Sequence, residues 1–441
     1  MKNYDLPLDR QSDFSFEASE SKPAEYLGDA IQKLSVWIDE IKTTNCLFYA
    51  KRLSGNDTGA TKSHQAGIYF PHNVMDDVFP EIDRVDVHNP DFLFKAIIDS
   101  HNLPEQELRV IYYNGKPRGD GTRNEKRITR WKEAAKNTPL QDSDNTGALV
   151  LFAFLKQQKE KNSDYLKIWV CNNPEEEAYA ELILGEVIPG SGVYGEPLNI
   201  FGGYQLPDGR LQNPNLLPSY WKEVFPSGKE ILDFLFEKYS FLDLTPDERL
   251  IKRRTKEFDL FKTIENIHSL PLISKGFNNI EDFIAIANSI TNRRKSRSGR
   301  SLEIHLEKVF TEEGLIHFSS QCVTENNKKP DFIFPSHQAY HDKDFPNDKL
   351  RMLAVKTTCK DRWRQLLNEA HRIKNPFLFT LQEGVSVNQY KEMKHEGVTL
   401  VIPEPIRKSF PEEIRSDLTN LTEFINQTKS LGGLCASIQT I

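Results

Sequence analysis

One lysine stands in a segment that otherwise has the composition of a buried strand. Lys356 directly follows the apolar residues of MLAV, and Asp331 follows a proline at the start of the earlier apolar segment PDFIF. Many Mg²⁺-dependent nucleases place one acid after such a proline and a second acid two positions before a lysine on the neighbouring strand. The carboxylates hold a metal that polarises the phosphate and lowers the pKa of its bound water. The lysine positions the water and offsets charge in the transition state.

The second acid of this pattern is missing from its usual position. Ala354 stands two residues before Lys356, whereas Glu369 lies thirteen residues after it, within a predicted helix over 361–374. The inward face of that helix is predicted to consist of Trp363, Leu366, Leu367 and Ala370. Glu369 is adjacent to this face, so the helix can return a carboxylate to the edge of the sheet.

A purely structural interpretation of these residues stays open at this point. Lys356 could be a strand-edge lysine that reaches solvent, and Asp331 could be a turn residue. Three features favour the nuclease interpretation: the apolar surroundings of the lysine, the order of the predicted elements, and a basic segment just upstream.

The composition is that of a globular protein with more than one domain. The chain has 441 residues, of which 38% are hydrophobic and 27% charged, and its net charge is −7. No apolar run approaches the length of about 18 residues typical of a membrane span. The N-terminal segment lacks the apolar core of a signal peptide, and the 5 cysteines follow no metal-binding spacing. We therefore expect a cytoplasmic protein with free thiols.

Two short segments carry most of the concentrated positive charge. Residues 116–130 contain six Lys or Arg against two acids, and residues 293–300, RRKSRSGR, contain five basic residues and no acid. Either run alone is most simply a solvated surface. Two runs in different parts of the chain favour a polyanionic partner such as nucleic acid.

The first half of the chain is predicted to be mainly β. A flexible tail over 1–25 is followed by an amphipathic helix over 26–42, then by a series of short apolar segments. The predicted strands are 46–52, 64–70, 107–113, 148–154, 166–172 and 181–188. This pattern is typical of a barrel or sandwich, and we assign it to an N-terminal domain over 26–188.

The second half is predicted to be an α/β domain over 219–441, joined to the first by a Gly- and Pro-rich linker over 189–218. Capping-box patterns at Ser227 and Thr245 each open a helix. Further helices are predicted over 280–291, 301–314, 361–374 and 387–396, with strands over 315–323, 330–334, 351–358, 376–381 and 398–402. The order predicts a mixed sheet flanked by helices.

With these residues in view, nearly the whole chain after its N-terminal tail resembles the EcoRII-type restriction endonucleases. The resemblance is carried by long stretches, among them NRRKSRSGRSLEIHLEKVF, KKPDFIFPS, LRMLAVKTTCKDRWRQLLNEA, LFTLQEGVS, LSGNDTGATKSHQAGIYFP and TRNEKRITRW. It implies a C-terminal restriction-endonuclease-like domain of the PD-(D/E)xK class that cuts duplex DNA at a CC(A/T)GG-type site with Mg²⁺. It also implies that Asp331 and Glu369 are metal ligands and that Lys356 is the catalytic lysine.

The resemblance further implies a set of DNA-contacting residues. Glu303 could add a carboxylate to the metal site, or could be an exposed helix acid. In the catalytic domain the segment that reads bases and phosphates would comprise Arg293, Arg294, Lys295, Arg297 and Arg300. Arginine is suited to this role because it bonds guanine bidentately in the major groove.

The N-terminal domain resembles a B3-type DNA-binding pseudobarrel, which in this family binds a second copy of the site as an effector. The matching positions are Lys51, His64, Tyr69, Arg123, Glu125, Lys126 and Arg127. These side chains suit guanine edges, cytosine amino groups and phosphates. His64 and Tyr69 could instead be packing residues, and Lys126 and Arg127 ordinary solvated charges. One departure from the family pattern is Lys62-Ser63, where small residues are expected; the lysine could contact phosphate or shift the loop.

The resulting hypothesis is a type II restriction enzyme that is inhibited by its own N-terminal domain until that domain binds DNA. We expect a homodimer through the catalytic domains, because a palindromic site presents matching half-sites to a two-fold protein. The main rival is a non-catalytic DNA-binding regulator with a decayed nuclease fold, and the intact Asp331, Lys356 and Glu369 disfavour it. A repair or recombination nuclease without strict sequence specificity is a third possibility.

Overall fold

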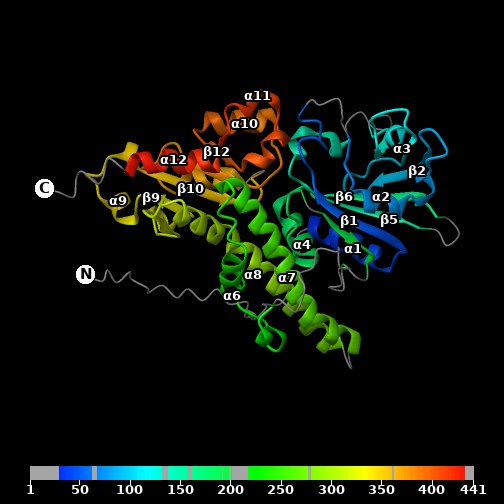
Figure 1. The fold of residues 1–441 in the computed structure, drawn as a ribbon, viewed down its shortest axis with the longest axis horizontal. Helices are drawn as coiled ribbons and strands as arrows, with labels where there is room; N and C mark the ends of the chain where they lie inside the picture. Colours follow the sequence, from blue (N-terminus) through cyan, green and yellow to red (C-terminus); the bar gives the residue numbers. More distant parts are fainter. Residues whose placement is uncertain are drawn as a thin grey trace.

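The computed structural model contains two β-sheets, one from each half of the chain, connected by long helices (Figure 1). It describes residues 29–61, 67–131, 138–156, 161–190, 192–197, 200, 217–276, 280–359 and 362–432. The predicted tail 1–25, His64 and the Lys62-Ser63 departure lie outside these ranges. No helix among the described residues is long and apolar enough to cross a membrane.

The N-terminal sheet has seven strands in the order β4-β3-β2-β6-β5-β1-β7. Neighbouring strands are antiparallel, except that β2 and β6 are parallel. The strands are β1 (Cys46–Arg52), β2 (Asp91–Ile98), β3 (Gln106–Tyr113), β4 (Glu125–Thr129), β5 (Leu149–Leu155), β6 (Tyr165–Val170) and β7 (Val193–Gly195). The helices of this half are α1 (Asp29–Thr43), α2 (His72–Val78), α3 (Gly115–Arg118) and α4 (Pro174–Leu184).

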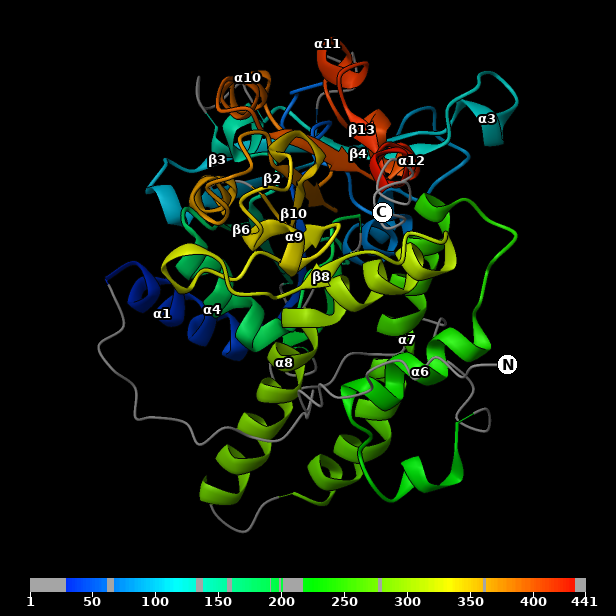
Figure 2. The same ribbon diagram turned by 90° about the vertical axis from the view of Figure 1, so that its left-hand side faces the viewer.

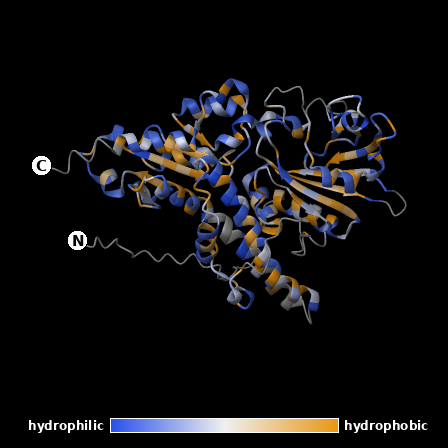
Figure 3. Ribbon diagram, viewed as in Figure 1, coloured by the Kyte–Doolittle hydropathy of each residue, from blue (hydrophilic) through white to orange (hydrophobic). Residues whose placement is uncertain are grey.

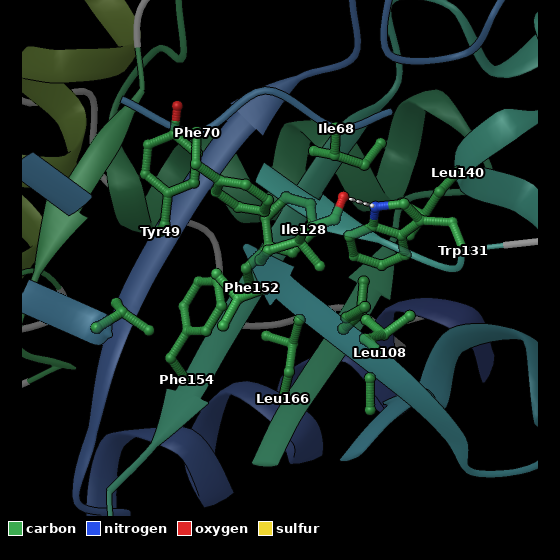
Figure 4. Close-up of a cluster of buried hydrophobic side chains, with 14 of the residues drawn as sticks. Tyr49, Ile68, Phe70, Leu108, Ile128, Trp131, Leu140, Phe152, Phe154 and Leu166 are labelled. Carbon is green, nitrogen blue, oxygen red and sulfur yellow. Dashed lines mark hydrogen bonds between the residues drawn. The ribbon is translucent and has the colours of Figure 1, made fainter. Parts of the chain in front are cut away.

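Both faces of the central strands are buried. In β5, Val150, Phe152 and Phe154 enter one apolar cluster, whereas the alternate residues enter a second cluster with α1 and α4. Figure 4 shows the first cluster, closed by Trp131, whose indole Nε1 donates to the carbonyl of Ile128 at 2.9 Å. A strand that is buried on both faces needs apolar residues at consecutive positions. Figure 3 shows this apolar colouring along the central strands.

Several sequence predictions for this half are confirmed and two are wrong. The strands predicted over 46–52, 107–113, 148–154 and 166–172 correspond to β1, β3, β5 and β6. The segment predicted as a strand over 181–188 begins instead as the end of α4. Asn173 caps that helix, and its first turn contains Pro174 followed by three glutamates. These helix-start signals have a larger effect on the structure than the short apolar run ELILGEVI. Within the predicted strand 64–70, the described residues 67–70 are not in a strand.

Part of the predicted linker belongs to the N-terminal sheet. Val193–Gly195 forms β7, which pairs antiparallel with β1, and Ile200 is buried in the cluster below it. Residues 201–216 lie outside the described part of the chain. The high density of Gly and Pro therefore marked a segment without periodicity, but residues 193–195 within it pair with the N-terminal sheet.

The C-terminal sheet has the order β13-β12-β11-β10-β9-β8. Strands β10 to β13 are parallel, and β9 and β8 add antiparallel at one edge, so the predicted mixed sheet is confirmed. The strands are β8 (Ser319–Ser320), β9 (Phe332–Phe334), β10 (Arg351–Lys356), β11 (Phe377–Thr380), β12 (Thr399–Ile402) and β13 (Thr419–Asn420). Apolar clusters cover both faces of the sheet.

Three helices connect the two sheets. α6 (Gly228–Lys238) and α7 (Pro246–Lys275) begin at the predicted capping boxes of Ser227 and Thr245. α8 is one continuous helix, Ile280–Glu312, where two helices were predicted. We predicted a break in α8 at its run of basic and small polar residues. A long helix can include such a run when packing stabilises the residues on either side of it. In both views α7 and α8 extend together beyond the sheets (Figures 1 and 2).

The helix predicted over 361–374 is shorter and of another kind. Its described part is a 3-10 helix, η9 (Arg362–Asn368), and Glu369 follows its last residue. Trp363, Leu366 and Ala370 are buried as expected, whereas Leu367 is partly buried. The remaining helices are α9 (His337–His341), α10 (Val387–His395), α11 (Glu412–Arg415) and α12 (Leu421–Gly432).

Candidate active site

Asp331 is fixed at the antiparallel edge of the C-terminal sheet, immediately before β9. It is 7% exposed. Its Oδ2 accepts from the backbone N–H of Val355 at 2.6 Å and from Nζ of Lys356 at 3.4 Å. Two hydrogen-bonded contacts to the neighbouring strand fix this carboxylate, so Asp331 is not a free turn residue.

Lys356 is the last residue of β10 and points to the same place. Its side chain is 23% exposed and forms an ion pair with Asp331. Lys356 pairs in register with Thr380 of the parallel strand β11, so it lies at the carboxyl ends of parallel strands, a common position for sites in α/β folds. A lysine that simply reached solvent would not face a buried carboxylate.

Glu369 reaches this region from the segment after η9. Burial raises the pKa of its carboxyl group, and Asp331 acts in the same direction, whereas Lys356 and Lys328 lower it. These interactions place Glu369 in the electrostatic field of both other residues. Among the described residues its Oε2 is buried and has no hydrogen-bond partner. A buried carboxylate oxygen without a partner is costly unless another group binds it.

A third acid, Glu303 on α8, also faces the site. Burial and the proximity of Asp331 raise the pKa of Glu303 to about 7. The amide of Gln321 connects the two acids, since Nε2 donates to Oε2 of Glu303 at 2.9 Å and to Oδ1 of Asp331 at 3.0 Å. Glu303 is therefore not an exposed helix acid. Gln321 was not predicted from the sequence, because a glutamine in the segment SSQC matches no metal-binding pattern.

The chemistry of these side chains fits a hard divalent cation. In the described part of the chain, no three His, Cys, Asp or Glu side chains are gathered closely enough to form a metal cluster. The three carboxylates nevertheless supply the oxygen donors that Mg²⁺ prefers, and one of those oxygens is buried without a partner. Asp331, Glu369 and Glu303 are the residues that would hold such an ion.

The basic run in α8 does not form a single exposed face. Arg294 is 4% exposed, pairs with Glu265 at 2.7 Å and donates to the carbonyl of Ile183 at 3.3 Å. Arg293 lies over the ring of Phe225 at 4.3 Å from its centroid. Arg300 is partly buried, and its charge lowers the pKa of the Glu303 carboxyl group. The side chains of Lys295 and Arg297 lie outside the described part of the chain. In this state Arg294 holds α8 to α7 and α4, which explains its burial but was not expected.

The predicted effector residues on β4 are divided between its two faces. Arg123 and Arg127 both pair with Glu125, at 2.7 and 2.8 Å, and Arg123 stacks on Tyr113 at 3.7 Å. Lys126 points the other way and is buried in ion pairs with Asp76 and Asp83. Because side chains alternate along a strand, these residues cannot all contact one DNA surface without rearrangement.

Lys51, near the end of β1, contacts both Tyr69 and the loop that contains Asp57. Nζ of Lys51 forms an ion pair with the buried Asp57 at 2.7 Å and donates to the carbonyl of Tyr69 at 3.1 Å. The side chain of Tyr69 is 64% exposed. Tyr69 is therefore a surface residue rather than a packing residue.

The loop that contains Asp57 docks against the catalytic half. The backbone N–H of Gly55 donates to the carbonyl of Glu383 at 2.8 Å. A Cβ on Gly55 would be far inside van der Waals contact with the carbonyl oxygen of Ser409. Burial raises the pKa of Glu383, which lies in the field of Lys51 and Asp57. The predicted effector surface therefore meets the catalytic half here: Gly55 bonds to Glu383, and Lys51 and Asp57 lie close enough to affect the Glu383 carboxyl group.

Gln382 links this interface to the segment that follows the strand carrying Lys356. Its Nε2 donates to the carbonyl of Thr146 in the N-terminal half at 3.3 Å, and its Oε1 accepts from the N–H of Cys359 at 3.0 Å. The next contact, Ser386 to Asp144, spans the same interface at 2.8 Å. Cys359 is three residues beyond Lys356, so Gln382 connects the N-terminal half to the segment that follows the candidate catalytic lysine.

Lys356 at the end of a parallel strand, in contact with Asp331 and with two more carboxylates close by, is the arrangement that the sequence predicts for a nuclease centre, here attached to a second sheet domain. Sequence comparisons agree. Residues 42–199 match the family described as restriction endonuclease EcoRII, N-terminal, and residues 261–425 match the family described as EcoRII C terminal. The type II restriction enzyme EcoRII of Escherichia coli is 49% identical over 402 residues, 91% of this chain and 98% of that protein. The chain belongs to the EcoRII family of type II restriction endonucleases.

Solved structures of another restriction enzyme are also similar. Metal-depleted Ecl18kI in complex with uncleaved, modified DNA is 17% identical, covers 48% of this chain and 80% of that chain, and gives a TM-score of 0.39. The complex of metal-depleted Ecl18kI with uncleaved DNA gives a TM-score of 0.38, with 49% of this chain and 85% of that chain covered.

Proposed function

We propose that the chain cleaves duplex DNA at a CC(A/T)GG-type site by Mg²⁺-dependent hydrolysis, and that its N-terminal domain inhibits cleavage until it binds a second DNA site. The observation that supports the reaction is the contact of Asp331 with Lys356 beside a buried, unpartnered oxygen of Glu369. We assign the C-terminal domain to the PD-(D/E)xK class with its second acid moved to Glu369, and the N-terminal domain to the B3-like pseudobarrels.

The residues divide the work by their chemistry. Mg²⁺, when bound, would polarise the scissile phosphate and lower the pKa of a coordinated water. Asp331, Glu369 and Glu303 would hold the ion. Lys356, held in place by Asp331, orients the attacking water and balances the charge that develops on the phosphate. The basic residues of α8 other than the buried Arg294, together with the exposed Tyr69 and Arg123, would contact the two DNA sites.

The docked interface supports inhibition. Gln382 bonds to the N-terminal domain and to the segment after Lys356, so a DNA duplex approaching this edge would meet the docked loop. Lys51, which is expected to bind an effector phosphate, already faces Asp57 and lies in the field of Glu383. Effector DNA would compete for Lys51 and favour the undocked form. It can shift the equilibrium only because it binds that form more tightly.

We further propose that the catalytic domains form a two-fold symmetric homodimer on the palindromic site. Each protomer would then cut one strand. The rival hypothesis of a non-catalytic regulator predicts that the site has lost its chemical groups. The contact between Asp331 and Lys356 and the position of Glu369 near both argue against it.

Digestion of a plasmid of known sequence tests the proposed reaction. In Mg²⁺ the purified protein should give discrete fragments whose ends all map to CC(A/T)GG-type sites, and in EDTA it should give none. Random fragmentation would indicate a nuclease without sequence specificity. Intact plasmid in Mg²⁺, with DNA binding retained in a gel-shift assay, would support the regulator instead.

A further inference from the structure

The side-chain amide of Gln321 lies between two carboxylates of the proposed metal site. Nε2 is 2.9 Å from Oε2 of Glu303 and 3.0 Å from Oδ1 of Asp331. A primary amide has two N–H hydrogens, so these two contacts use its full capacity to donate. The opposite orientation of the amide would place Oε1 against two carboxylates, which hydrogen-bond geometry disfavours.

The backbone also fixes Gln321 in this position. It follows β8 and has a φ of 51°, a left-handed conformation that is uncommon for a residue other than glycine. Its own N–H donates to the carbonyl of Asp331 at 3.2 Å. A residue in this conformation persists where its surroundings require it, and here the same residue contacts Asp331 through both backbone and side chain.

The amide and a metal ion would compete for the same oxygens. Nε2 of Gln321 bonds to an oxygen of each acid, so the carboxylates of Glu303 and Asp331 lie close together, and two like charges at this separation repel each other without a cation between them. The hydrogen bonds of Gln321 reduce this repulsion in the metal-free protein. Mg²⁺ binds oxygen at about 2.0–2.1 Å, so an ion that ligates the same two oxygens leaves no space for Nε2 between them.

We propose that Gln321 is a positioning residue that acts as a placeholder for the metal: its amide stabilises the empty pair of carboxylates and is displaced when the ion binds. This inference rests on the proposed metal-dependent function. An interaction that exists only in the metal-free state opposes metal binding, so Gln321 sets the metal concentration at which the site fills.

Direct metal binding to the full-length protein tests the proposal. The Kd for Mn²⁺, which takes the same oxygen ligands, is measured from the electron paramagnetic resonance signal of the free ion. Gln321→Met keeps the length of the side chain and removes the donor, and it should bind Mn²⁺ about tenfold more tightly than the wild type, the size expected for losing hydrogen bonds to charged groups. Gln338→Met, on the exposed side of α9, is the matched control and should leave the Kd unchanged. Gln321→Ala gives the same prediction if the methionine variant does not fold.

The direction of the change separates the possible results. A damaged site, or a site in which Gln321 is itself a ligand, would bind Mn²⁺ more weakly after substitution, and that result overturns the proposal. An unchanged Kd also overturns it. If the wild type binds no Mn²⁺ and Asp331→Asn behaves identically, the proposed metal site itself is wrong, and the placeholder role is rejected with it.

Discussion

Replacing Lys356 or Glu369 by alanine is expected to reduce DNA cleavage by roughly 10³-fold or more while leaving DNA binding nearly intact. Lys356→Ala removes the cation beside Asp331 that would balance charge in the transition state, a loss of the same kind as deleting one preorganised electrostatic contact. Glu369→Ala removes the carboxylate that we propose replaces the acid missing at Ala354. The measurement is the single-turnover cleavage rate of an oligonucleotide duplex in Mg²⁺, with binding measured in Ca²⁺.

Lys343→Ala is the control for Lys356, because Lys343 is exposed and lies outside the site. It should cleave at the wild-type rate. A normal rate for Glu369→Ala would contradict the relocated acid, because no other residue in the chain was assigned to that role. Loss of both binding and cleavage would show instead that the substitution disturbed the fold.

Gly55→Ala is expected to release cleavage from its requirement for effector DNA. The added Cβ would collide with the carbonyl oxygen of Ser409 across the domain interface, whereas within its own domain its nearest neighbour is Cγ2 of Thr61 at 3.3 Å. Gly55 does not have a positive φ, so alanine can adopt the backbone conformation. Cleavage of a one-site substrate without effector should rise at least about tenfold, since a tenfold shift needs only about 1.4 kcal/mol.

Two further proteins calibrate this result. Gly121→Ala adds the same group where it meets only Gly115 of its own domain, at 3.3 Å, and should remain effector-dependent. A chain lacking residues 1–218 should be active on one-site DNA and defines the fully released rate. If the truncated chain is folded but inert, or if Gly55→Ala stays as dependent as the wild type, docking is not the cause of inhibition.

The candidate catalytic residues could be identified from the sequence because the proposed chemistry constrains their types. A lysine among apolar residues and a Pro-Asp pair at a strand start remain visible in the sequence, and Glu369 was found by asking which nearby element could supply an acid. Gln321 was invisible because an amide that bonds two carboxylates leaves no periodic or compositional signal. Its role depends on β8, β9 and α8 meeting in space.

The errors in the fold also have physical causes. The apolar run after Ala180 was interpreted as a strand, although Asn173 and Pro174 start a helix before it. Arg294 was assigned to DNA from the family resemblance and the charge of its segment, whereas in this structure it pairs with Glu265, which lies 29 residues earlier on a neighbouring helix. Pairing between distant helices is not encoded in any local pattern, so a basic run can be an exposed surface or a buried link between domains.

Effector-dependent cleavage is tested most directly by digesting a plasmid that carries one CC(A/T)GG-type site, in Mg²⁺, with and without a short duplex containing the same site. We expect slow cleavage of the plasmid alone and rapid cleavage at its single site when the duplex is added. Equal rates with and without the duplex would contradict regulation by a second site, and no cleavage under either condition would contradict the assignment of Asp331, Lys356 and Glu369 as a working nuclease centre.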